Sequence, residues 1–232
     1  MDLVHSSEQL IEKTAEYMRT ALVDAEPGHD WWHTTRVWKI AKEISSFEGG
    51  ESVVVELASL LHDIADYKFH GGDESVGPRK AKEWLMSSGA APLLAERVSE
   101  IIASMNFKGA QASEAISLEH AIVQDADRLD ALGAIGIARC FSYAGHFGRE
   151  LYNPEIMPQL FLSKEEYRNS KSTALNHFFE KLLLLKDQML TETGRILASE
   201  KHEFMLEYLQ RFLVEAQADH LQPFLERVVN KN

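Results

Sequence analysis

The chain has 232 residues, 45% hydrophobic and 26% charged, which excludes a disordered protein and fits one large domain or two small ones. Its 36 acidic and 24 basic residues give a net charge of −12 with histidine neutral, which argues against nucleic-acid binding. A single cysteine, Cys140, excludes an internal disulfide, and the sequence has no apolar run of about 18 residues and no signal-peptide pattern at its start. We therefore expect a cytoplasmic protein that binds neither nucleic acid nor a membrane.

Apolar residues recur at helical spacing from the start of the chain. A first helix is expected from Leu3 to Met18, followed by a break at Pro27-Gly28. Asp30 is placed to cap a second helix over 31–47, which Gly49-Gly50 ends. The segment 52–64 is apolar on nearly all sides, which predicts a buried helix.

The rest of the chain continues the helical pattern between two irregular stretches. We expect loops over 69–78 and 145–163, and helices over 79–88, 93–105, 118–131 and 133–143. Ser163 and Glu166 resemble a capping box that opens a helical stretch through Leu190, and further helices reach Ala216 and follow Pro223. The prediction is an all-α helical bundle in a single domain, 1–232, with a metal-site core at about 20–140 and a helical C-terminal extension at about 163–230.

Four residues are the strongest candidates for chemistry: His33, the adjacent pair His62 and Asp63, and Asp127. His62 and Asp63 close a strongly apolar helix, and ionisable side chains at such a position need partners. Asp127 shares a helix with Asp125 and Asp130, and three carboxylates so close together need a cation. Two imidazoles and two carboxylates suit a divalent ion such as Mn²⁺, Fe²⁺, Ni²⁺, Co²⁺ or Zn²⁺, which acts as a Lewis acid and lowers the pKa of bound water.

Basic residues near these four are candidates for binding phosphate. Arg36 follows His33 by one turn, Lys68 follows the His62-Asp63 pair, and Arg128 adjoins Asp127. Two neutral histidines and two aspartates cancel the charge of a divalent ion. The attraction for an anionic substrate must therefore come from these basic side chains.

At these residues the sequence resembles the HD-domain metal-dependent phosphohydrolases. The pattern is a histidine, a His-Asp pair at a helix end, and an aspartate within Ala-Asp-Arg-Leu. The resemblance implies that His33, His62, Asp63 and Asp127 are the metal ligands and that Asp66, three residues after the pair, handles protons. The wider strings 29–37, 62–73 and 124–133 resemble a bacterial subfamily of small HD hydrolases, as do 177–182 and 191–194. The family implies a helical bundle, and one similar subgroup cleaves nucleoside triphosphates to monophosphate and pyrophosphate.

One departure from the family bears on the number of metal ions. Dinuclear HD proteins carry two more histidines between the His-Asp pair and the last aspartate, whereas this interval holds His70 and His120, neither at the family spacing. We therefore expect one divalent ion, Mn²⁺ first, with Mg²⁺, Ni²⁺, Co²⁺, Fe²⁺ and Zn²⁺ as alternatives.

Charge arithmetic favours a triphosphate substrate. A triphosphate carries about −4, of which Arg36, Lys68 and Arg128 offset three, with Lys108 or Lys181 as a further candidate. A monophosphate carries only about −2 and leaves such a cluster undercompensated. We expect attack at the α-phosphoryl group with pyrophosphate leaving, and a small-molecule partner that is a nucleotide.

Other interpretations stay open at this point. His33 could be a core histidine, Asp63 and Asp127 could cap helices, Asp66 could hydrogen-bond a ligand histidine, and Arg128 could neutralise a neighbouring aspartate. His29 and Asp30 are interpreted as a feature of the helix start, with His29 facing substrate as the alternative. Alternative functions are a nucleoside monophosphate or alarmone hydrolase, a di-iron oxygenase, and a non-catalytic nucleotide-binding module. Whether the protein is a monomer or a homodimer is left open.

Overall fold

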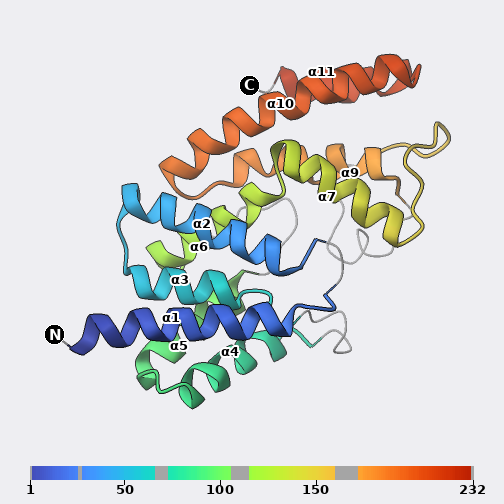
Figure 1. The fold of residues 1–232 in the computed structure, drawn as a ribbon. Coiled ribbons are helices and arrows are strands. Elements are labelled where there is room, and N and C mark those ends of the chain that lie inside the picture. Colours follow the sequence, from blue (N-terminus) through green and yellow to red (C-terminus); the bar gives the residue numbers. More distant parts are fainter. Residues whose placement is uncertain (1, 26–27, 66–72, 106–114, 160–171, 231–232) are drawn as a thin grey trace. The chain divides into compact units, whose positions relative to one another are not determined.

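A computed structural model describes residues 2–25, 28–65, 73–105, 115–159 and 172–230 (Figure 1). The regular structure in these ranges is entirely helical, which confirms the predicted all-α class. In chain order the helices are α1 (Asp2–Ala21), α2 (Trp31–Glu48), α3 (Ser52–Leu61), α4 (Val76–Ser87), α5 (Pro92–Ser104), α6 (Leu118–Asp130), α7 (Gly133–His146), α9 (Ala174–Glu180), α10 (Glu192–Glu215) and α11 (Gln222–Val229). None of the helices in the described ranges is long and apolar enough to cross a membrane.

Internal contacts divide the chain into two compact units. The first comprises Met1–Asn106 and Glu114–Asp127, and the second comprises Phe107–Ser113 and Arg128–Asn232. The division falls within α6, between Asp127 and Arg128. The expectation that 1–232 forms a single domain stays a prediction.

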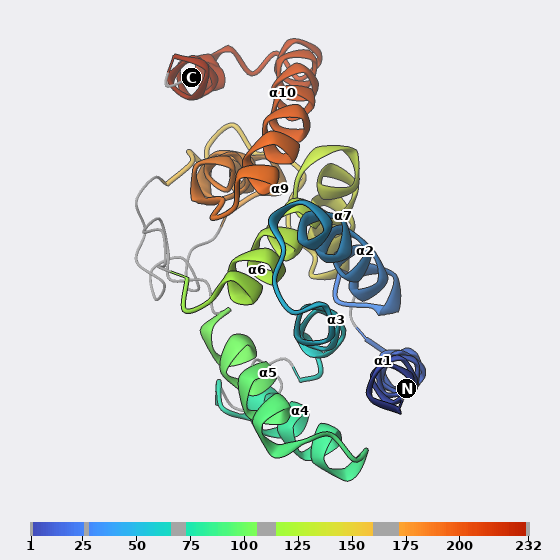
Figure 2. The ribbon, with the colours of Figure 1, turned by 90° about the vertical axis from the view of Figure 1, so that its left-hand side faces the viewer.

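The core of the first unit is built around α3. Its residues from Val54 to Leu61 are all buried, as the nearly continuous apolar sequence predicts. Helices α1, α2 and α5 pack around it, and Figure 2 shows α3 end-on among these three neighbours. The short connection through Gly49 and Gly50, both with positive φ, brings α2 and α3 together as neighbours.

The start of α3 is tied to α5 and α6 by a charged cluster in the first unit. The backbone N–H of Glu51 donates to Glu119 Oε1 over 3.0 Å, and Arg97 pairs with the carboxylates of both Glu51 and Glu119. Gly50 also borders α6 here, since a Cβ on it would lie in van der Waals contact with Ile122 Cδ1, at 3.4 Å. These contacts fix α6 against the start of α3, and thereby the position of the aspartates that α6 carries.

The second unit is packed around α7, α9 and α10. An aromatic cluster joins these helices, with ring contacts among Phe141, Phe178, Tyr208 and Phe212. Figure 1 shows α10 as the long helix that follows α9 within this unit.

The helical stretch expected through Leu190 is not one regular α-helix in the described residues from 172 onward. Helix α9 ends at Glu180, and the chain continues through two 3₁₀ turns, η2 (Leu182–Leu184) and η3 (Lys186–Gln188). The backbone of Lys181 leaves helical geometry at φ −141° and ψ −58°. Over so few residues a leucine run has nearly the same spacing in an α-helix and in 3₁₀ turns, so its sequence does not separate them. The expected capping box at Ser163 and Glu166 lies outside the described residues.

Candidate metal centre

Helix α2 begins where the sequence predicts, and its cap places His33. The Asp30 side chain accepts a hydrogen bond from the backbone N–H of His33 over 2.8 Å, as an N-cap residue does. His33 therefore lies in the first turn of α2, on the face that buries Val37, Ala41 and Ile44. Only 1% of the His33 side chain is exposed.

The end of α3 presents His62 and Asp63. His62 is the C-cap residue of α3, and its Nδ1 lies 2.8 Å from the carbonyl oxygen of Ser59. Nδ1–H donates to this carbonyl, which leaves the Nε2 lone pair as the candidate ligand. Asp63 follows the C-cap residue. The position at which the apolar helix α3 ends therefore sets the positions of His62 and Asp63.

The polar ends of four side chains from α2, the end of α3, and α6 converge in the first unit. His33 Nε2 lies 3.2 Å from His62 Nε2, 3.4 Å from Asp63 Oδ2 and 3.5 Å from Asp127 Oδ1. His62 Nε2 lies 3.4 Å from Asp63 Oδ2 and 3.8 Å from Asp127 Oδ1. The four residues that the sequence singled out are thus brought together.

These separations suit a divalent ion. Ligand bonds of about 2.1 Å put neighbouring ligand atoms about 3.0 Å apart in an octahedron and about 3.4 Å apart in a tetrahedron. The five distances fall at or slightly above these values. Among the described residues, two overlapping groups meet the distance requirement for a metal: His29, His33 and Asp63, and His33, His62 and Asp127. The donor set and the spacing both fit such an ion.

The charges within the cluster shift the pKa values of His62 and Asp63. Burial alone would lower the pKa of His62, but the charge and hydrogen bond of Asp63, together with the charge of Asp127, raise it to about 9. Burial opposes ionisation of Asp63, yet the neighbouring charges of His62 and His29 hold its pKa well below the usual range. In the protein without metal, protonated imidazole balances the carboxylates. A divalent ion would supply that positive charge and displace the proton.

The residues expected to bind phosphate or move protons are described only in part. Arg36 lies in α2, three residues after His33 and therefore on nearly the same side of the helix. Arg128 is buried, and its Nη1 donates to the carbonyl oxygen of Gln188 within the second unit. Asp66 and Lys68 lie outside the described residues, as do His70 and Lys108. Phosphate contacts and proton transfer by Arg36, Arg128, Lys68 and Asp66 stay predictions.

Two further histidines, His29 and His120, have contacts that the sequence did not predict. His29, interpreted as a feature of the helix start, has Nδ1 2.7 Å from Asp63 Oδ2. The signal for this contact in the sequence is the four-residue spacing between His29 and His33 around the Asp30 cap. His120 is buried, and its Nδ1 accepts from the backbone N–H of Ile116 over 3.3 Å.

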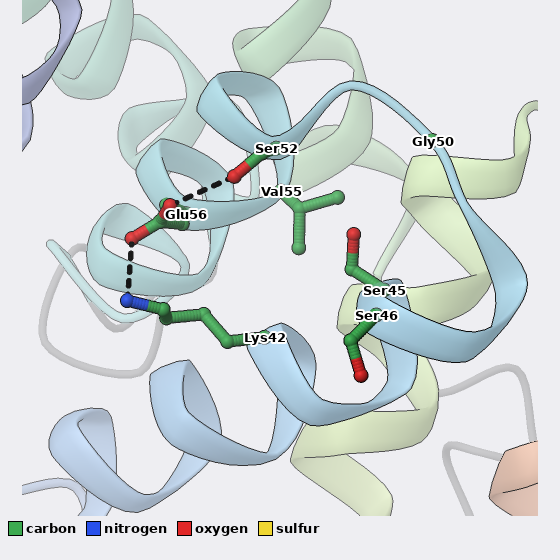
Figure 3. Close-up of a pocket in the computed structure, with 7 residues that line it drawn as sticks. All are labelled: Lys42, Ser45, Ser46, Gly50, Ser52, Val55 and Glu56. Carbon is green, nitrogen blue, oxygen red and sulfur yellow. Dashed lines mark hydrogen bonds and ion pairs between the residues drawn. The ribbon is translucent and has the colours of Figure 1, made fainter.

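A separate cavity lies at the other end of the α2–α3 pair (Figure 3). It measures about 270 Å³ and is lined by Lys42, Ser45, Ser46, Gly50, Ser52, Val55 and Glu56. Its buried carboxylate, Glu56, accepts from Ser52 Oγ over 2.9 Å and pairs with Lys42 over 3.4 Å, as the dashed lines of Figure 3 mark. It also accepts from Trp38 Nε1 over 2.9 Å. These partners account for Glu56 as a structural group.

Comparison with known proteins places the cluster within a family region. A family model described as HD domain matches residues 31–132, which include all four clustered side chains. The YpgQ protein of Bacillus subtilis is 40% identical over 205 residues, covering 86% of this chain and 92% of that protein.

Solved structures agree with the sequence comparison. An HD-superfamily hydrolase from Bacillus thuringiensis is 39% identical, with a TM-score of 0.70 over 91% of this chain and 99% of that one. The structure of B. subtilis YpgQ in complex with ADP is 34% identical, with a TM-score of 0.73 over 90% of this chain and 96% of that one.

Proposed function

The chain belongs to the HD-domain superfamily of metal-dependent phosphohydrolases, and on that premise we propose that it hydrolyses a nucleoside triphosphate to the monophosphate and pyrophosphate. The ligands of a single divalent ion, Mn²⁺ first, are His33, His62, Asp63 and Asp127. Nucleoside triphosphates are cytoplasmic metabolites, and the enzyme is proposed to act in that compartment.

One observation carries the proposal: four side chains, from α2, the end of α3, and α6, converge, and His33 and His62 lie 3.2–3.8 Å from each other and from both carboxylates. Two buried imidazoles beside two partly exposed carboxylates form a mixed nitrogen and oxygen donor set, which suits a divalent ion. When bound, the ion supplies Lewis acidity, polarising a phosphoryl oxygen and making water acidic enough to attack near neutral pH.

The nucleotide part of the proposal is supported by a relative and by charge. B. subtilis YpgQ, a similar protein, has been solved in complex with ADP. A divalent ion held by two aspartates is near neutral, so binding of a substrate with a charge of about −4 depends on cationic side chains. Arg36 lies in α2 three residues after His33, on nearly the same side of the helix, and takes this role in the proposal.

The remaining roles follow the family resemblance. Asp66 takes a proton from the attacking water or gives one to the leaving oxygen, while Arg36, Lys68 and Arg128 hold phosphate oxygens as charge develops on them. The buried position of Arg128 and its bond to the Gln188 carbonyl also give that residue a structural role in the second unit.

The test is a substrate screen on the purified protein with Mn²⁺. Nucleoside mono-, di- and triphosphates and ppGpp are offered, and released orthophosphate and pyrophosphate are measured separately. Pyrophosphate from triphosphates is the expected result. Rapid hydrolysis of monophosphates, or orthophosphate as the sole inorganic product from triphosphates, would assign a different reaction to the site.

A further inference from the structure

His29 lies against the metal cluster although it is outside the four-residue ligand pattern. It directly precedes Asp30, whose side chain caps α2, so the cap sets His29 just before the helix and His33 within its first turn. The two imidazole rings meet edge to face, with centroids 5.8 Å apart. Two imidazoles therefore lie at the start of α2, and the more buried of them, His33, is one of the four candidate ligands.

The contact of His29 is with the oxygen of Asp63 that faces the other ligands. His29 Nδ1 lies 2.7 Å from Asp63 Oδ2. The same Oδ2 lies 3.4 Å from the Nε2 atoms of both His33 and His62. A carboxylate oxygen has two lone pairs, so it can accept one hydrogen bond and still bind an ion.

The distance distinguishes a hydrogen bond from shared coordination. Ligands about 2.1 Å from one ion lie about 3.0 Å apart or more, whereas charge-assisted N–H···O bonds measure about 2.7–2.9 Å. The 2.7 Å between His29 and Asp63 is also shorter than each of the five separations within the ligand set. Both the neutral Nδ1–H tautomer and the imidazolium donate from this atom, so the contact does not depend on the charge of the ring.

We propose that His29 is a positioning residue for Asp63: its Nδ1–H holds Oδ2 in the orientation that binds the divalent ion. The inference rests on the metal site of the proposed function, and it assigns His29 no contact with the ion. Of the His29 side chain 34% is exposed, against 1% for His33, which agrees with a place at the edge of the cluster. Partners that orient a metal ligand in this way typically change metal affinity 10–100-fold when they are removed.

Three substitutions at position 29 test the geometry of the contact. His29→Leu removes the donor. His29→Asn keeps an N–H donor near the place of Nδ1, and His29→Gln moves the donor outward to the place of Nε2. We expect Mn²⁺ affinity to fall 10–100-fold in His29→Leu and His29→Gln and to recover to within a few-fold of wild type in His29→Asn. His146→Ala, at an exposed histidine of α7, is the matched control and should bind Mn²⁺ as wild type does.

Two measurements without substrate separate the possible failures. Calorimetric titration with Mn²⁺ gives the affinity, and X-ray absorption of the Co²⁺-saturated proteins gives the number of imidazole ligands. Equal affinity in wild type and His29→Leu would overturn the inference, and so would the loss of one imidazole ligand in His29→Asn, because His29 would then bind the ion itself. Wild-type protein that binds no metal would instead refute the proposed function.

Discussion

His177, in α9 of the second unit, makes the stability of the protein depend on pH in a direction that can be measured. The ring is half-buried, and burial together with the charges of Lys181 and Arg149 lowers its pKa to about 3. In the unfolded chain a histidine has a pKa of about 6.5. The folded protein therefore holds this imidazole neutral at every pH at which most proteins are studied.

The sign follows from where the proton goes. Below pH 6.5 the unfolded chain binds a proton at His177 that the folded protein does not bind, so the free energy of unfolding decreases as the pH falls. The slope approaches about 1.4 kcal/mol per pH unit only well below pH 6.5, so the loss between pH 7 and pH 5 is about 2 kcal/mol.

The assay compares unfolding by urea at pH 5, 6 and 7 for wild type, His177→Gln and His146→Gln. Helix content is followed by circular dichroism, since Trp31, Trp32, Trp38 and Trp84 all belong to the first unit and fluorescence would report mainly on it. Relative to wild type, His177→Gln should gain about 2 kcal/mol on going from pH 7 to pH 5. The exposed His146 is the matched control, and its variant should follow wild type. Parallel pH profiles for wild type and His177→Gln would refute the reasoning.

The other predictions concern the site and its surroundings. His62→Ala and Asp63→Ala should each abolish bound Mn²⁺ and hydrolysis together, measured by elemental analysis and product release; turnover by a metal-free variant would contradict the ligand assignment. Arg36→Ala should raise KM for the triphosphate much more than it changes metal content. Mn²⁺ should raise the melting temperature and EDTA should reverse the rise, because the ion binds the folded state. Glu56→Leu, which removes the acceptor of the partly buried Trp38 Nε1–H and of Ser52 Oγ, should lower the free energy of unfolding by about 0.5–1.5 kcal/mol with KM unchanged.

The convergence of the four candidate ligands could be predicted from sequence because local rules fix the position of most of them, while their binding of a metal ion stays a prediction. Asp30 caps α2, which sets the depth of His33, and the apolar run of α3 ends at His62 and Asp63. The family pattern then adds Asp127. A short motif at a helix end carries this information because helix caps and helix periodicity are local properties.

The features that sequence reasoning missed depend on contacts between distant residues. The bond from His29 to Asp63 spans 34 positions, and the bond from Arg128 to the Gln188 carbonyl spans 60. Which atom a long or rotatable side chain reaches is decided by the packing of whole helices rather than by its neighbours in sequence. The same holds for the 3₁₀ turns after Lys181, where the leucine pattern fits either helix type.

The candidate centre is held in place by bonds of the protein itself. The Asp30 cap orients His33, the Ser59 carbonyl orients His62, and the Glu119 bond to the Glu51 N–H fixes α6 at the start of α3. Each of these bonds is formed with backbone groups at a helix end and needs no metal. Proteins that depend on an ion for folding lack such a preformed frame. Because the candidate ligand atoms already lie close together, with five separations of 3.2–3.8 Å, we expect metal binding here to require little rearrangement of helices.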